Sequence, residues 1–310
     1  MTGRFLRQLG IGTLLTLLPA VAFAQEAAPH QTEPGHPTPG QIGLQPSVTP
    51  IMDSIHVFHD GILLWTSVLI TLLVLALLII VMVRFNAKRN PTPSTTTHNT
   101  LVEVAWTVLP IIILVVIAIP SFSVLTDQLT MPDGERKYLG SNIFSFGEVE
   151  VPAPGLTVKA TGQQWNWDYE YVDQGLSFNS AMLQEEARLA DKPNQPRLLA
   201  VNYELVVPVE TTVRMQITAD PGGVIHAFAV PSFGIKIDAV PGKLNETWFN
   251  ARKEGLYYGQ CSELCGRDHA YMPIAVRVVN DRDYAAWLDQ AKKKYATDDS
   301  RPATNVVAAK

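Results

Sequence analysis

Residues 261–272 concentrate the side chains of this sequence that bind soft metals. They hold both cysteines of the chain, one of its seven histidines and a methionine, in the order Cys261, Cys265, His269, Met272. Thiolate, imidazole and thioether ligands together select copper over hard cations such as magnesium or calcium. The loop still needs an imidazole from elsewhere in the chain, and His226, within an apolar strand-like run, is the best candidate.

The spacing of these residues separates the possible sites. Structural zinc pairs a Cys-x2-4-Cys unit with a second Cys or His pair and has little use for the thioether of Met272. A blue-copper site takes one cysteine, two histidines and a weak axial methionine, so this loop has one cysteine too many. Two thiolates on one tight loop can instead bridge two copper ions, with Met272 and the backbone carbonyl of Glu263 as the weak ligands. A plain disulfide, and a packed core role for His226, are the alternatives.

The loop resembles the binuclear copper (CuA) loop of subunit II of the haem-copper cytochrome c oxidases, Cys-Ser-Glu-x-Cys-Gly-x-x-His-x-x-Met, at every motif position. The resemblance continues through two apolar segments and most of the C-terminal half. It implies a subunit that accepts electrons from cytochrome c at two copper ions. The electrons then pass to the haem of subunit I, where O2 is reduced to water with proton translocation. His226 lies in a Val-x-His-x-x-x-Val-Pro segment and matches the family's first copper ligand.

Three further residues gain roles through the same resemblance. The stretch 162–171 is similar to the family's Gly-His-Gln-Trp-x-Trp-x-Tyr-Glu-Tyr segment, with Gln163 in place of the histidine, and implies that electrons enter at Trp165. Glu103 matches the mouth of a proton channel shared with subunit I; the alternative is a carboxylate that favours a helix N-terminus. The Glu263 side chain matches a ligand of a magnesium ion shared with subunit I; the alternative is a solvated loop acid.

Two apolar runs predict a membrane anchor. Residues 62–83 and about 104–125 are each long enough to cross a bilayer as a helix at about 1.5 Å per residue. Three basic residues follow the first run at once, so the short connection should face the cytoplasm and both outer ends the periplasm. We therefore expect a two-helix transmembrane hairpin over residues 51–130, in a bacterial inner membrane.

The two ends of the sequence have a different character. Residues 1–24 are typical of a signal peptide, with a basic start, an apolar run and a small-x-small cleavage site before Gln25, which favours a bacterial source. Residues 25–50 are rich in Pro, Gly, Gln and His, and predict a flexible leader. Residues 298–310 are expected to form a disordered tail.

Residues 131–297 predict a periplasmic domain rich in β-strands. Apolar and polar residues alternate over 156–160, 213–217 and 274–278, a pattern typical of a half-buried sandwich or barrel. Alternation also places Trp165 on the same face of a strand as the three aromatic residues that follow it. The family implies a cupredoxin-like Greek-key β-barrel here, so the expected fold is a membrane-anchored α+β protein. Residues 183–197 predict an inserted loop, and the segment from Asp281 has helical spacing.

Composition limits the function without choosing one. The formal net charge of −5 over 310 residues identifies no partner, and no nucleic-acid partner is expected. The chain has no Cys-x-x-Cys-His, so it carries no attached c-type haem. A quinol oxidase subunit II would lack the copper ligands, and a nitrous-oxide reductase would be soluble with a large second domain. A membrane-tethered copper-delivery protein would need exposed, exchangeable ligands.

Overall fold

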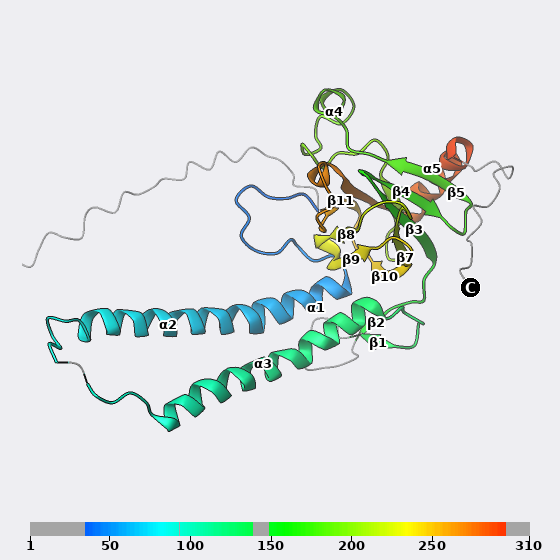
Figure 1. Ribbon diagram of the computed structural model, residues 1–310. Helices are drawn as coiled ribbons and strands as arrows, with labels where there is room; N and C mark the ends of the chain where they lie inside the picture. Colours follow the sequence, from blue (N-terminus) through cyan, green and yellow to red (C-terminus); the bar gives the residue numbers. More distant parts are fainter. Residues whose placement is uncertain (1–34, 93, 139–148, 296–310) are drawn as a thin grey trace, which may run out of the picture. The chain divides into compact units, whose positions relative to one another are not determined.

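The computed structural model describes residues 35–92, 94–138 and 149–295 (Figure 1). The signal peptide expected at 1–24, the first part of the leader and the tail expected at 298–310 lie outside the described residues. Within them, helices come first, strands follow, and a helix ends the described chain.

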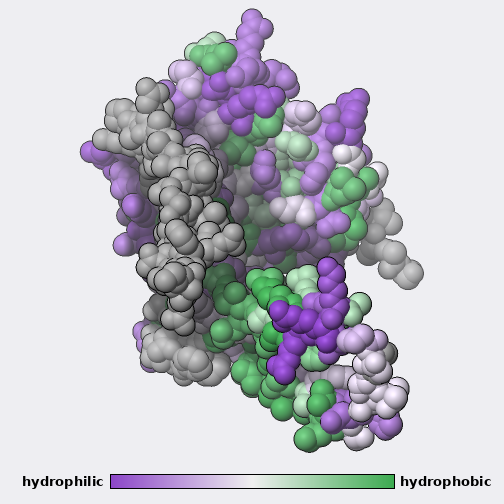
Figure 2. Space-filling view, turned by 90° about the vertical axis from the view of Figure 1, so that its left-hand side faces the viewer, coloured by the Kyte–Doolittle hydropathy of each residue, from purple (hydrophilic) through white to green (hydrophobic). Residues whose placement is uncertain are grey.

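Two long apolar helical segments form the predicted hairpin. The first runs through α1 (Pro50–Phe58), a π-helical turn (His59–Leu63) and α2 (Leu64–Arg84), and the second is α3 (Thr100–Leu129). They contain 35 and 30 residues, so each exceeds the length needed to cross the ~30 Å hydrocarbon core. No residue of α2 is buried, and Figure 2 shows apolar side chains gathered on these helices. The faces that they present therefore suit lipid or other apolar chains.

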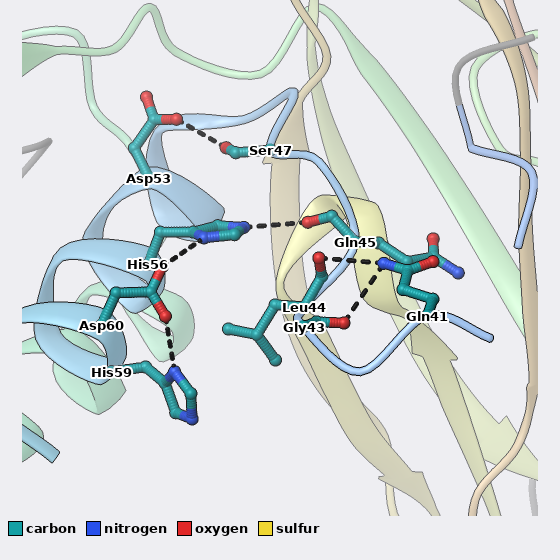
Figure 3. Close-up of polar contacts among 9 residues, drawn as sticks. All are labelled: Gln41, Gly43, Leu44, Gln45, Ser47, Asp53, His56, His59 and Asp60. Atoms are coloured by element: carbon teal, nitrogen blue, oxygen red, sulfur yellow. Dashed lines mark hydrogen bonds and ion pairs between the residues drawn. The ribbon is translucent and has the colours of Figure 1, made fainter. Parts of the chain in front are cut away.

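The segment before α1 has no helix or strand over residues 35–49, yet its end is anchored (Figure 3). The backbone carbonyl of Gln45 lies 2.8 Å from Nε2 of His56 in α1. The hydroxyl of Thr49, fully buried, donates to the carbonyl of Phe233 in the β domain at 2.7 Å. Thr49 also accepts a hydrogen bond from the α1 backbone, so this residue both caps the helix and attaches it to the β domain.

Two five-stranded sheets make up the β domain, in the orders β10-β7-β3-β4-β5 and β6-β12-β11-β8-β9. The strands are β3 (Leu156–Gln163), β4 (Asn166–Tyr171), β5 (Leu176–Ser180), β6 (Leu205–Pro208), β7 (Thr212–Ala219), β8 (His226–Val230), β9 (Ile235–Ala239), β10 (Asn245–Asn250), β11 (Gly255–Cys261) and β12 (Pro273–Val279). A short ribbon of β1 (Lys137–Tyr138) and β2 (Val149–Glu150) precedes them. This two-sheet arrangement is the sandwich that the alternation predicted, and it fits the cupredoxin-like fold that the family resemblance implied.

The predicted strands are confirmed, because the three alternating runs lie within β3, β7 and β12. Burial alternates strictly along β3, whose inward side chains face the core between the sheets. The segment 183–197 contains a short helix, α4 (Glu185–Asp191), which the prediction of a loop did not include. The helix predicted from Asp281 is confirmed as α5 (Asp281–Tyr295).

The second long apolar helix, α3, ends directly on the β domain. The indole Nε1 of Trp248 in β10 donates to the carbonyl of Asp127 at 2.9 Å. The hydroxyl of Thr247 donates to the carbonyl of Gln128 at 3.1 Å. Two of the last α3 carbonyls, which a helix leaves without partners, are thus satisfied by β10 side chains.

A carboxylate whose side chain is only 9% exposed, that of Glu204, ties the α4 segment to the second sheet. Glu204 accepts hydrogen bonds from Arg277 of β12 and, at 2.8 Å each, from Lys192 and Gln195. Burial by itself would raise the pKa of Glu204, but the Arg277 and Lys192 donors outweigh it and lower the pKa to about 2.

We predict that Glu204→Gln destabilises the β domain in a pH-dependent way. A carboxyl whose pKa is lower in the folded state contributes its full stability above its ordinary pKa of 4.5 and loses it as the pH falls toward 2. The variant should lower the free energy of unfolding by about 2–3 kcal/mol at pH 7 and by much less near pH 2. Denaturant unfolding at the two pH values measures this. Glu170→Gln, which breaks the exposed pair with Lys159, is the control and should change little. A Glu204→Gln difference that stays constant with pH would show that the charge contributes nothing.

Candidate metal centre

Strand pairing brings His226 to the loop 261–272. Cys261 is the last residue of β11, and His226 is the first residue of β8. The two strands are antiparallel, with Cys261 opposite Phe228. His226 therefore lies two residues beyond Cys261's partner, alongside the start of the loop.

All six predicted donor groups meet in one cluster. Each cysteine faces one imidazole and one weak donor. The sulfur of Cys261 lies 3.9 Å from Nδ1 of His226 and 3.3 Å from the carbonyl oxygen of Glu263. The sulfur of Cys265 lies 3.5 Å from Nδ1 of His269 and 3.6 Å from the sulfur of Met272. The two cysteine sulfurs are 3.8 Å apart, and both are free thiols.

The cluster is shielded from solvent. Cys261, Cys265 and Met272 are 6%, 2% and 1% exposed, and His226 is fully buried. Nδ1 of His226 faces the thiol, whereas its Nε2 is buried without a hydrogen-bond partner among the described residues.

Burial also sets the protonation of these groups. It raises the pKa of the Cys265 thiol to about 12, with a further contribution from neighbouring Cys261. Burial, together with His269, lowers the pKa of His226, which keeps that ring neutral and able to bind a metal. Two thiols, two imidazoles, a thioether and a carbonyl form a soft donor set that fits copper. Of these residues, His226, Cys261 and Cys265 have donor atoms within 4.8 Å of one another.

The structure places Trp165 in the turn between β3 and β4, immediately before the strand that carries the aromatic residues that follow it. Trp165 is partly buried and packs against the same core as these residues. The indole Nε1 of Trp165 donates to the carbonyl of Cys265 at 3.0 Å. Trp165 is thus hydrogen-bonded to Cys265, the residue that supplies one of the two thiols.

The Trp165 indole packs against the backbone of the metal-binding loop on one side and borders a surface pocket on another. A Cβ on Gly266, whose φ is +115°, would lie 3.1 Å from the indole, so the ring rests against the loop backbone. The exposed Arg267 guanidinium lies 5.3 Å from the ring centroid, within cation–π range. A pocket of about 360 Å³ borders Trp165 and is also lined by Asp268 and Tyr271.

A second tryptophan contacts the cluster, and sequence reasoning assigned it only to the core. Trp167 is fully buried in β4. Its Nε1 donates to the carbonyl of Met272 at 3.3 Å, and its ring lies edge-on to His226 with centroids 6.1 Å apart. The alternation of β4 indicated that Trp167 points inward, but no sequence signal identified what it would touch there.

Two predicted acids have simpler surroundings. The Glu263 side chain is exposed, while its carbonyl turns inward to the thiol of Cys261. Glu103 lies in the first turn of α3, where it accepts a hydrogen bond from the backbone N–H of Asn99 at 3.0 Å. This geometry matches the helix-capping alternative for Glu103.

Comparison with known families agrees with this geometry. The family described as "Cytochrome C oxidase subunit II, periplasmic domain" matches residues 156–279. The corresponding transmembrane domain matches residues 37–124. The chain belongs to the cytochrome c oxidase subunit II family. It is therefore a subunit of an oxidoreductase, its two apolar helices anchor it in the membrane, and its β domain is of the copper-binding type.

Several relatives are similar over most of this subunit II. A probable cytochrome c oxidase subunit 2 of Rickettsia bellii is 44% identical over 293 residues, which cover 94% of this chain and 96% of that protein. The cytochrome c oxidase subunit 2 of Cereibacter sphaeroides is 42% identical over 273 residues, 83% of this chain and 82% of that one. A crystal structure of the periplasmic domain of subunit II (CoxB) of Bradyrhizobium japonicum is 57% identical, covers 47% of this chain and 99% of that chain, and has a TM-score of 0.43.

Proposed function

We propose that this subunit II accepts electrons from cytochrome c at a pair of copper ions and passes them to the haem of subunit I, for reduction of O2 to water coupled to proton translocation. The observation that carries the proposal is the paired donor set. Each thiol has its own imidazole and its own weak donor. The proposed copper ligands are His226, Cys261, the Glu263 carbonyl, Cys265, His269 and Met272.

The 3.8 Å separation of the two thiols lets both contact the same ions, and the separate imidazole and weak donor beside each thiol favour two ions over one. Two copper ions held by Cys261 and Cys265 would share one unpaired electron, which would lower the reorganisation that accompanies electron transfer. The chain contributes rigidity, because Cys261 ends β11, Met272 directly precedes β12, and His226 begins β8. Three regular strands thus position three of the six donors, and the loop supplies the other three.

Burial favours an electron-transfer site over a copper-delivery site. A delivery protein exchanges its ion with partners, so its ligands must be reached from solvent. Here Cys261, Cys265, Met272 and His226 are buried. Only His269, of the two proposed imidazole ligands, is partly exposed. Ligands buried in this way would hold a metal tightly.

The remaining partners follow from the surfaces of the subunit. The exposed apolar faces of α2 and α3 suit subunit I, other oxidase subunits and lipid. The basic residues after α2 support a cytoplasmic connection, with the copper domain in the periplasm of a bacterial inner membrane.

The exposed Glu263 carboxylate is proposed to contribute to a magnesium ion completed by subunit I, since one carboxylate cannot hold magnesium alone. The magnesium or manganese content of a Glu263→Gln complex tests this, and an undiminished content would refute it.

Electron paramagnetic resonance with a copper count tests the proposed centre. The detergent-solubilised subunit, loaded with copper, should bind two ions per chain. Its spectrum should show one electron shared equally by two copper nuclei. One ion per chain with the hyperfine pattern of a single nucleus would contradict the paired centre and favour blue-copper transfer or copper delivery.

We predict that Trp165→Phe slows electron transfer from cytochrome c. Phenylalanine keeps an aromatic ring but removes the hydrogen bond to the Cys265 carbonyl. The rate of copper reduction by cytochrome c, measured by stopped flow, should fall by about tenfold or more, with copper content unchanged. Trp287→Phe makes the same change in α5 and is the control. An unaltered rate in Trp165→Phe would mean that electrons enter elsewhere.

Glu103 is proposed to lie at the mouth of a proton channel, in addition to its capping contact. In the assembled oxidase, Glu103→Ala should slow proton uptake and turnover severalfold while the copper spectrum stays unchanged. Asn99→Ala removes the other half of the cap, its side-chain bond to Val102, and serves as the control for helix fraying. Equal effects of the two substitutions would reduce Glu103 to its capping role.

A further inference from the structure

The inward-facing residues of β3 become smaller toward the metal cluster. They are Leu156, Val158, Ala160 and Gly162 in that order, and the series ends at glycine. An ideal Cβ on Gly162 would lie 2.8 Å from Cδ2, 3.1 Å from Cγ and 3.2 Å from Cβ of His226. The imidazole of His226 therefore occupies the space that a side chain at position 162 would fill.

We propose that Gly162 is a positioning residue of the copper centre, whose missing side chain forms the seat for the His226 ring. The proposal deepens the proposed function and rests on it. Glycine is needed here for space and not for backbone freedom, because Gly162 lies within a regular strand and has no positive φ.

The backbone of Gly162 cannot retreat from the ring. β3 is the central strand of its sheet, and Gly162 pairs with Trp167 of β4 on one side and Ala219 of β7 on the other. Its carbonyl also accepts a hydrogen bond from the backbone N–H of Asp220 at 3.0 Å. A shift of Gly162 would disturb the hydrogen bonds of β3 with both β4 and β7. An added methyl group would therefore move the His226 ring instead.

The ring has close neighbours on its other sides, so a displaced ring would change its position relative to the loop. Cδ2, the atom nearest Gly162, and Nδ1 lie on opposite sides of the imidazole, and Nδ1 faces the Cys261 sulfur at 3.9 Å. Trp167 lies edge-on to the same ring. Restoring an ordinary carbon–carbon separation of about 3.5 Å would displace the ring by roughly 0.7 Å. Metal–ligand distances tolerate only about 0.2 Å, so this displacement is large for a ligand.

The test compares Gly162→Ala with the full-length, detergent-solubilised wild-type chain. We expect the copper dissociation constant to rise by roughly 10–100-fold, as for other residues that orient metal ligands. We also expect the hyperfine coupling of any remaining copper to become unequal between the two nuclei. Gly222→Ala is the matched control, because its new Cβ would lie 3.6 Å from Asp220, an ordinary contact, in the loop before β8. Copper affinity and spectrum in Gly162→Ala equal to those of Gly222→Ala would overturn the proposal.

A double variant separates a moved ring from a damaged fold. His226→Ala removes the ring that the methyl group would meet. If Gly162 acts through this ring, Gly162→Ala should destabilise the metal-free protein clearly less in the His226→Ala background than in the wild-type background, because only the 3.2 Å contact with the Cβ of residue 226 then remains. Equal destabilisation in both backgrounds would overturn the proposal. Failure of the wild-type chain to show a shared-electron spectrum would instead contradict the proposed function, so the two failures are distinguishable.

Discussion

The metal cluster depends on the antiparallel pairing of β8 with β11. This ladder carries His226 across 35 residues of sequence to the thiol of Cys261. A loop of twelve residues can supply its own thiols, imidazole and thioether, but it cannot supply a second imidazole on the opposite side. The two-sheet fold supplies that imidazole from a strand and buries it, and the central strand β3 leaves room for it at Gly162.

The donor set could be predicted from sequence because its chemistry is local. Cys261, Cys265, His269 and Met272 lie within one turn-rich segment, where ligand types and spacing already exclude most metals. The long apolar helices and the alternating strands could also be predicted from the sequence, because hydrophobic periodicity reflects burial directly. The strand that pairs with the strand of His226 was harder to predict, and the family motif, not periodicity, identified that histidine.

What sequence could not provide was the arrangement across strands. Alternation gave the side on which Trp165 packs, but not that this residue lies in a turn and donates a hydrogen bond to the loop backbone. Trp167 looked like ordinary core, and its contacts with Met272 and His226 arise only from the packing of one sheet on the other. The seat at Gly162 is likewise a property of two strands, since neither sequence segment alone shows which ring fills the space.

The hydrogen bond from Trp165 to the Cys265 carbonyl affects how the surface around Trp165 can evolve. Under the proposed roles, the route from the surface indole to the metal crosses that one contact and then the covalent bonds of a single residue. The electronic coupling is therefore built inside this chain. A donor protein needs only to touch the indole, so the residues around it can be replaced to suit a different donor while the conduction path stays intact.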